Sequence, residues 1–285
     1  MNSEKYVLVS IVSSILLTLT KGILAFITNS LSIFTESIDS FLDIINLIFG
    51  YVAIKVSKKP PDESHPYGHE KIESLVAYTE VIFIFLISVV IVYEGFQRIL
   101  NPQRLFNTFV GISILLITLV ADAILSYINY HGAKKHNSPV LKANYINYLG
   151  DVFRTFAVIF ALILAIYNFY IFDVIISFLL ASILAYEATG LLKESLHILL
   201  DTAPKGILRE VKRIVTGTEG VRKIRNIRAR KVGDKLFVDI VITVDKSLDV
   251  EDAHKIASTI ESSLRDSLGN VDVIVHIEPC YVRIG

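Results

Sequence analysis

The sequence predicts a membrane all-α domain of six transmembrane helices, followed by a small α+β domain of αββαβ order. Three observations support this fold class. Long apolar runs fill residues 6–200, residues 205–285 read as an ordinary charged soluble domain, and the mean hydropathy of the chain is +0.56. We expect residues 1–203 to form the transmembrane domain and residues 204–285 the soluble domain.

Each membrane helix is expected from one apolar run of about 20 residues, the length that crosses the hydrocarbon core of a bilayer. The first run follows the residues MNSEKY and has no small-residue cleavage site, so we interpret it as a retained helix and not as a signal peptide. An even number of crossings places both chain ends on one side. The six runs lie at about 7–28, 32–55, 73–98, 107–131, 141–167 and 171–192.

Basic residues in the connections predict the orientation. The connections at 29–30 and 168–170 contain no Lys or Arg, whereas those at 55–71 and 134–142 are rich in them. Because basic loops stay in the cytoplasm, both termini and the soluble domain are expected there. The connection at 98–104 carries two arginines and is a mild exception.

The soluble domain is expected to contain two helices and three strands. Gly233-Asp234 separates two half-buried strands and predicts a hairpin, and Asp249 is expected to cap the second helix. The expected elements are a helix at 205–217, strands at 222–232 and 235–244, a helix at 250–268 and a strand at 271–278.

Composition and missing motifs exclude several function classes. The chain has 28 basic and 28 acidic residues and no basic stripe, which gives no support for nucleic-acid binding. A single cysteine, Cys280, allows neither an intrachain disulfide nor a thiolate metal cluster. The chain has no H-E-x-x-H, G-x-S-x-G or phosphate-binding glycine loop, so an enzyme is not expected.

Two polar pairs interrupt the apolar runs. Asp39 and Asp43 lie in the second run and Asn147 and Asp151 in the fifth, each pair with the i, i+4 spacing that places both side chains on one helix face. An ionisable residue at membrane depth indicates an ion or proton pathway. A helix–helix hydrogen bond or a cap would explain one such acid alone, but two matching pairs favour a metal or proton site. Glu36 and Asp122 are further intramembrane acids, for which a structural or accessory role is equally consistent.

Two other groups of residues fit a divalent cation. Asp62, His65 and His69 lie in the loop P-P-D-E-S-H-P-Y-G-H-E-K, whose Pro and Gly favour folding around an ion. An ordinary solvated loop is the alternative. In the soluble domain His276 and Glu278 share one face of a strand, and with His254 they form a further possible site. Surface placement without metal explains these three residues equally well.

The motifs together resemble the cation diffusion facilitators over essentially the whole chain. They are D-x-x-x-D in the second run, [HDN]-x-x-x-D in the fifth, D-x-x-H-P-Y-G-H-x-K-x-E after the second run, and L-L-D-x-A-P before the soluble domain. The resemblance implies a homodimeric antiporter in a lipid bilayer, which exports divalent transition-metal ions from the cytoplasm in exchange for protons. It implies no cofactor other than the transported or regulatory metal.

The resemblance also implies residue roles. Asp39, Asp43, Asn147 and Asp151 occupy the transport-site positions, with Asp62, His65 and His69 at the loop site. Lys71 and Asp201 are placed as a charge pair that ties the two domains together across the dimer, and His254, His276 and Glu278 fall on part of the cytoplasmic metal site. Arg225 and Val241 stand where zinc exporters have further histidines, which puts a second cytoplasmic ion in doubt.

Asn147 is the departure that bears on the transported metal. Zinc-transporting relatives usually have His or Asp at this position, and an amide leaves three carboxylates and a carbonyl oxygen, a shell that suits Mn²⁺ better than Zn²⁺. Manganese exporters resemble the chain here, so Mn²⁺ is favoured, with Fe²⁺, Co²⁺ and Zn²⁺ as alternatives. Because an amide does not titrate, protons are expected on Asp39, Asp43 and Asp151.

Two other functions are consistent with part of the pattern. A membrane-anchored sensor or scaffold would bind divalent cations without transporting them, although it would have no use for the intramembrane acids. An ion channel would pass ions down their gradient without proton exchange. The compact chain without targeting extensions favours the plasma membrane of a prokaryote.

Overall fold

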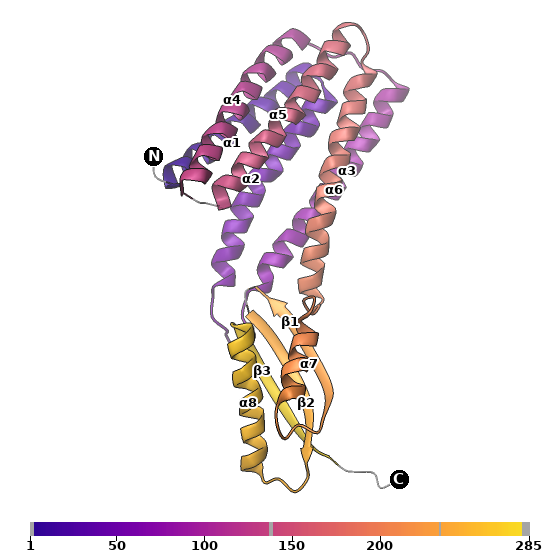
Figure 1. The fold of residues 1–285 in the computed structure, drawn as a ribbon. Helices are drawn as coiled ribbons and strands as arrows, with labels where there is room; N and C mark the ends of the chain where they lie inside the picture. The colour runs from indigo at the N-terminus through magenta and orange to yellow at the C-terminus, as the bar shows by residue number, and fades with distance from the viewer. Residues whose placement is uncertain (1–2, 137–138, 234, 281–285) are drawn as a thin grey trace. The chain divides into compact units, whose positions relative to one another are not determined.

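A computed structural model describes residues 3–136, 139–233 and 235–280. Over these residues it contains six long apolar helices, which confirms the predicted fold class (Figure 1). Each is long and apolar enough to cross a bilayer. They are α1 (Ser3–Thr28), α2 (Leu31–Ser57), α3 (Lys71–Leu100), α4 (Thr108–His136), α5 (Pro139–Ile166) and α6 (Ile171–Leu199).

The connections between helices follow from local sequence. Asn29 follows α1 with φ 55° and Asn168 follows α5 with φ 68°, the left-handed conformation in which Asn commonly ends helices. Asp173 near the start of α6 accepts hydrogen bonds from the N–H groups of Leu31 (2.7 Å) and Ser32 (3.2 Å) and thereby caps the N-terminus of α2. The short connections at 29–30 and 168–170 therefore have specific structural causes.

The membrane helices pack through a buried apolar cluster and a few close contacts. The cluster joins Leu24 of α1, Ile33 of α2, Leu115 of α4 and Leu162 of α5. Helices α4 and α5 lie side by side (Figure 1). Many other large apolar side chains are exposed, such as Phe26 at 89%, which is the surface expected for contact with lipid.

The small domain contains α7 (Ile207–Gly217), β1 (Lys223–Val232), β2 (Lys235–Asp245), α8 (Val250–Leu268) and β3 (Val271–Cys280). Its sheet has the order β1-β2-β3, with β2 antiparallel to β1 and parallel to β3. Alternate residues of β2, from Leu236 to Val244, pack with Val211 of α7 and with Ile260 of α8 in one core.

Two local expectations for this domain are confirmed over the residues that the structure describes. Val232 pairs with Lys235, so a two-residue turn joins β1 and β2, and Gly233 has the φ of 58° that such a turn requires. Its partner in the turn, Asp234, lies outside the described residues. The Asp249 side chain accepts a 2.8 Å hydrogen bond from the Asp252 N–H and caps α8 as expected.

Contacts divide the chain into two compact units. One contains residues 1–52 and 79–191, and the other contains residues 53–78 and 192–285. The second unit therefore includes the ends of three membrane helices and the loop between α2 and α3 as well as the small domain. The domain boundary expected between residues 203 and 204 stays a prediction.

Candidate metal transport site

The two polar pairs of the sequence lie on neighbouring helices. Asp39 and Asp43 belong to α2, Asn147 and Asp151 to α5, and the Asn147 side-chain N–H donates a 2.8 Å hydrogen bond to Asp43 Oδ2. Asp39 and Asp151 are each only 6% exposed. The structure thus brings Asp43 and Asn147 into direct contact and buries the other two residues one turn away along the same helices.

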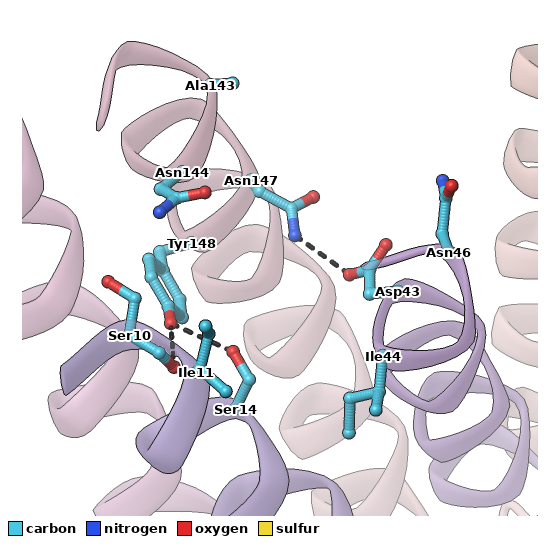
Figure 2. A pocket seen from close by; sticks show the side chains of 10 residues that line it. All are labelled: Ser10, Ile11, Ser14, Asp43, Ile44, Asn46, Ala143, Asn144, Asn147 and Tyr148. Carbon is cyan, nitrogen blue, oxygen red and sulfur yellow. Dashed lines mark hydrogen bonds between the residues drawn. The ribbon is translucent and has the colours of Figure 1, made fainter. Parts of the chain in front are cut away.

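A pocket of about 390 Å³ opens beside the Asp43–Asn147 pair (Figure 2). Its polar lining consists of carboxylate, amide and hydroxyl groups, and no His or Cys is among the described residues that line it. Tyr148 lies 2.9 Å from the Ser14 hydroxyl and donates a 2.8 Å hydrogen bond to the Ser10 carbonyl, which fixes one wall. The pocket can therefore offer oxygen ligands to a hard cation.

Arg154 contacts both of the remaining acids of the site. Its Nε lies 2.8 Å from Asp39 Oδ2 and its Nη2 lies 2.8 Å from Asp151 Oδ1. The four expected ligands are therefore arranged as two groups, Asp43 with Asn147 and Asp39 with Asp151 around Arg154. This arginine was not anticipated, although its position three residues after Asp151 gave a signal, since i, i+3 residues are neighbours on a helix.

A second buried cation, Lys21, lies among the other intramembrane acids. Its Nζ is 2.8 Å from Glu36 Oε1 and 3.6 Å from Asp122 Oδ2, and the Thr155 hydroxyl also donates to Glu36. Asp122 thus has a cationic neighbour on another helix. The signal was a lysine within an apolar run, because such residues pair with acids inside the bundle.

The loop between α2 and α3 gathers Asp62, His65 and His69. Their ligand atoms lie within 4.8 Å of one another, the only group of three such His, Cys, Asp or Glu atoms in the described part of the chain. His69 Nε2 is 3.2 Å from Asp62 Oδ2, and His65 Nδ1 is 3.3 Å from Asp62 Oδ1. The structure therefore brings the three residues together, and an ion bound by them stays a prediction.

A tight turn and a set of hydrogen bonds to Asp62 determine the conformation of this loop. The Gly68 N–H donates a 3.0 Å hydrogen bond to the His65 carbonyl and Gly68 has φ 92°, so the His-Pro-Tyr-Gly turn brings both histidines together. The Ser64 hydroxyl donates to Asp62 Oδ1 at 2.8 Å, and the His65 N–H donates to the same oxygen at 2.7 Å. These hydrogen bonds hold the pKa of Asp62 well below its ordinary value and leave Oδ2 facing His69.

The three expected ligands of the small domain are not brought together in one chain. His276 and Glu278 alternate with Val273, Val275 and Ile277, which pack in the helix-covered core, so they lie on the opposite face of the sheet from α8. His254 is exposed on α8. Glu278 instead pairs with Arg225, at 2.9 Å. The cytoplasmic metal site stays a prediction.

Lys71 and Asp201 form the expected charge pair within one chain, with Nζ 2.9 Å from Oδ1. Arg230 Nη1 lies 3.2 Å from the other Asp201 oxygen and was not anticipated. Partial burial acts to raise the pKa of Asp201, but the hydrogen bonds and charges of Lys71 and Arg230 outweigh it and leave the pKa below its ordinary value. A role of this pair across a dimer stays a prediction.

Comparison with known proteins gives matches over nearly the whole chain. Residues 7–200 match the cation efflux transmembrane domain, and residues 203–280 match the cytoplasmic domain of cation efflux proteins, a family designated ZT_dimer. The cation-efflux pump FieF of Citrobacter koseri is 30% identical over 256 residues, which cover 90% of this chain and 85% of the pump. FieF of Serratia proteamaculans is 28% identical over 256 residues, which also cover 90% of this chain and 85% of the pump.

Among solved structures, a nickel form of the MamM CTD is 23% identical and covers 27% of this chain and all of its own, with a TM-score of 0.26. The two domain matches carry the assignment, because they follow each other in the order of the six apolar helices and the small α+β domain. The chain belongs to the cation diffusion facilitator family and is an integral membrane cation efflux transporter, not an enzyme.

Proposed function

We propose that this transporter exports divalent transition-metal ions, with Mn²⁺ preferred over Zn²⁺, in exchange for protons. The observation that carries the metal preference is the contact between Asn147 and Asp43 beside a pocket whose described polar lining is carboxylate, amide and hydroxyl. Mn²⁺ accepts an all-oxygen shell readily, whereas Zn²⁺ gains more from nitrogen or sulfur ligands. Fe²⁺ and Co²⁺ are the next candidates.

The proposed transport site consists of Asp39, Asp43, Asn147 and Asp151. In the present arrangement Asn147 directs its N–H toward Asp43, so its carbonyl oxygen becomes a ligand only after the amide turns or the two side chains separate. The carboxylates accept protons when the metal leaves, because the Asn147 amide does not titrate. Helices α2 and α5 carry the ion while the bundle alternates between its inward and outward openings.

The remaining assignments belong to the same proposal. We place both termini in the cytoplasm on the strength of the basic connections. We also assign the six helices to the plasma membrane of a prokaryote. The match to a family designated ZT_dimer supports a homodimer. Asp62, His65 and His69 would bind a further ion, as would His254, His276 and Glu278, and Lys71 and Asp201 would join the domains across the dimer.

Transport into proteoliposomes tests the proposal. Purified protein is reconstituted with a pH-sensitive dye inside, and Mn²⁺ and Zn²⁺ uptake are compared for the wild type, Asp151→Ala and Glu94→Gln. Glu94 is a matched control because it is an acid in a membrane helix that pairs with Arg98 instead of facing the site. We expect Mn²⁺ uptake with proton release in the wild type and in Glu94→Gln, and none in Asp151→Ala.

Other outcomes separate the parts of the proposal. Equal or faster uptake of Zn²⁺ would reject the metal preference and leave proton-coupled efflux standing. Uptake without proton movement would reject antiport in favour of a channel. Metal binding without uptake of either ion would favour another transported metal or a membrane-anchored sensor.

A further inference from the structure

We propose that Arg154 is a built-in counter-cation of the transport site, which competes with the metal ion for Asp39 and Asp151 and so weakens metal binding. The inference rests on the proposed function in one respect, since Asp39 and Asp151 must be ligands of the transported ion. Arg154 sets the affinity for the ion without being a ligand itself.

The geometry places the guanidinium where a metal ligand shell would have to form. Arg154 contacts one oxygen of Asp39 and one of Asp151, each at 2.8 Å, and its side chain is 14% exposed. Asp151 and Arg154 belong to α5, and Asp39 belongs to α2. The guanidinium therefore links the same two helices that the metal would link.

The surface of α5 has room for this position. A Cβ on Gly150 would lie 3.4 Å from Arg154 Nη1 and 3.6 Å from Arg154 Cζ. The guanidinium thus lies back along α5 at a glycine, over the turn that precedes its own Cα, as helical side chains do. The glycine therefore leaves space on α5 for the guanidinium in the position where it contacts Asp39 and Asp151.

Competition with the metal follows from charge. Arginine keeps its proton in proteins, so the guanidinium stays cationic in every state of the transporter. A divalent ion bound to Asp39 and Asp151 would meet this positive charge at short range, and like charges repel strongly where water is scarce. Metal binding to both acids therefore requires the guanidinium to move away from them.

A site that is free for only part of the time binds its ligand more weakly in proportion to that fraction. Arg154 therefore lowers the affinity for the ion before loading and assists release afterwards, because it returns to the same two carboxylates. The alternative is that Arg154 favours metal binding. If Arg154 only held the acids in place for the metal, its removal would weaken binding.

Metal affinity of the full-length protein distinguishes the two roles. Mn²⁺ binding is measured by calorimetry on detergent-purified protein, and the component that Asp43→Asn removes defines the transport site. In Arg154→Met the methionine side chain replaces the unbranched aliphatic part of the arginine, and the positive charge is removed. We expect its transport-site Kd to fall by about tenfold, whereas Arg154→Lys, which keeps a charge, stays closer to the wild type.

Arg98→Met is the matched control. Arg98 is 12% exposed, pairs with the acid Glu94 on its own helix and donates hydrogen bonds to Asn29, which follows α1. It contacts none of the site acids in these interactions, so the Kd of Arg98→Met is expected to equal that of the wild type. In proteoliposomes Arg154→Met is expected to lower both KM and kcat for Mn²⁺, because tighter binding slows release. A merely structural arginine would give no such joint decrease.

Two results would overturn different conclusions. Loss of binding in Asp43→Asn together with an unchanged or weaker affinity in Arg154→Met would reject the role of Arg154 alone. Binding that survives in Asp43→Asn would reject the proposed transport site. If Arg154→Met does not fold, Arg154→Gln serves as the neutral variant, and its Kd must still lie below that of Arg154→Lys.

Discussion

Lys21 on α1 and Glu36 on α2 form a buried ion pair, with Nζ 2.8 Å from Oε1 and side chains that are 1% and 0% exposed. Asp122 of α4 lies 3.6 Å from the same ammonium, and Thr155 of α5 donates to Glu36. The pair therefore belongs to a buried polar cluster to which four helices each contribute one side chain. It borders the transport site, because Lys21, Asp43, Asn147 and Asp151 line one small cavity of about 20 Å³.

Removal of the lysine alone is expected to destabilise the helix bundle. Lys21→Met leaves Glu36 as an uncompensated buried charge, and such losses reduce the free energy of unfolding by about 3–5 kcal/mol. Combining Lys21→Met with Glu36→Gln removes the stranded charge and is expected to restore part of the loss. Denaturant titration of the full-length protein in detergent measures both values.

Lys55→Met is the control for the lysine substitution, because Lys55 is exposed at the end of α2. Its effect is expected to stay within about 0.5 kcal/mol. A Lys21→Met protein as stable as the wild type, or a double variant less stable than the single one, would show that the ion pair does not stabilise the helix bundle.

A histidine at Asn147 is expected to change the metal preference. Asn147→His replaces an amide with imidazole beside Asp43, and we expect the ratio of Zn²⁺ to Mn²⁺ transport to rise by about tenfold, which corresponds to about 1.4 kcal/mol. Asn144→His is the matched control, because Asn144 lines the same pocket one turn earlier on α5 (Figure 2). An equal rise in both variants would show that position 147 is not a ligand.

The same variant is expected to change the dependence of transport on pH. Wild-type transport has no titrating side chain at position 147, whereas the imidazole of Asn147→His must lose its proton to bind metal. A new inflection in the Mn²⁺ and Zn²⁺ transport rates is therefore expected between about pH 5 and 8, with activity falling as the pH is lowered. Identical pH profiles for the wild type and the variant would contradict a ligand at this position.

The sequence predicted the fold well because its signals are local. Apolar runs determine the six helices, and the capping residue Asp249 and the turn at Gly233 lie within a few residues of the elements they define. The i, i+4 spacing also predicted one polar pair on each of two helices, and α2 and α5 carry these pairs. Local patterns could not show which cations from other positions would meet these acids.

Arg154 and Lys21 are two cations whose contacts could not be predicted from the sequence. Each lies in an apolar run and was treated as part of a membrane helix, yet each contacts acids on a second helix that the sequence does not identify as a neighbour. His254 is a residue that the sequence grouped with two others but that the structure keeps apart from them. Its chemistry matches that of His276 and Glu278, but the sheet lies between them, a relationship that depends on how the helices cover the strands.

Asp62 is expected to be required for metal binding at the loop. Asp62→Asn removes the carboxylate that faces both histidines, so the number of ions bound to each chain is expected to fall by about one. Glu63→Gln is the control, since Glu63 is the adjacent acid but is not in the cluster. Equal stoichiometry for Asp62→Asn and the wild type, measured by metal analysis after equilibrium dialysis, would exclude an ion at the loop.

The pair of Lys71 and Asp201 is expected to stabilise its unit at neutral pH and to lose this contribution only in acid. The folded-state pKa of Asp201 is lowered, so its contribution is complete above the unfolded-state value of about 3.9 and disappears as the pH falls through the folded-state pKa. The Lys71 and Asp201 side chains are 39% and 42% exposed, so water screens the pair and it contributes about 0.2–1 kcal/mol. The stability difference between the wild type and Asp201→Asn is therefore expected to stay constant from about pH 5 to 8.

Asparagine is the appropriate substitution because Asp201 has φ 54°, a left-handed conformation that Asn also tolerates. Asp201→Ala would lose the same ion pairs and add backbone strain, so it is expected to be less stable than Asp201→Asn at every pH. Thermal unfolding of the full-length protein from about pH 3 to 8 provides the comparison. A difference between wild type and Asp201→Asn that changes between pH 5 and 8 would require a group other than Asp201 to control it, because the Asp201 carboxylate stays charged throughout that range.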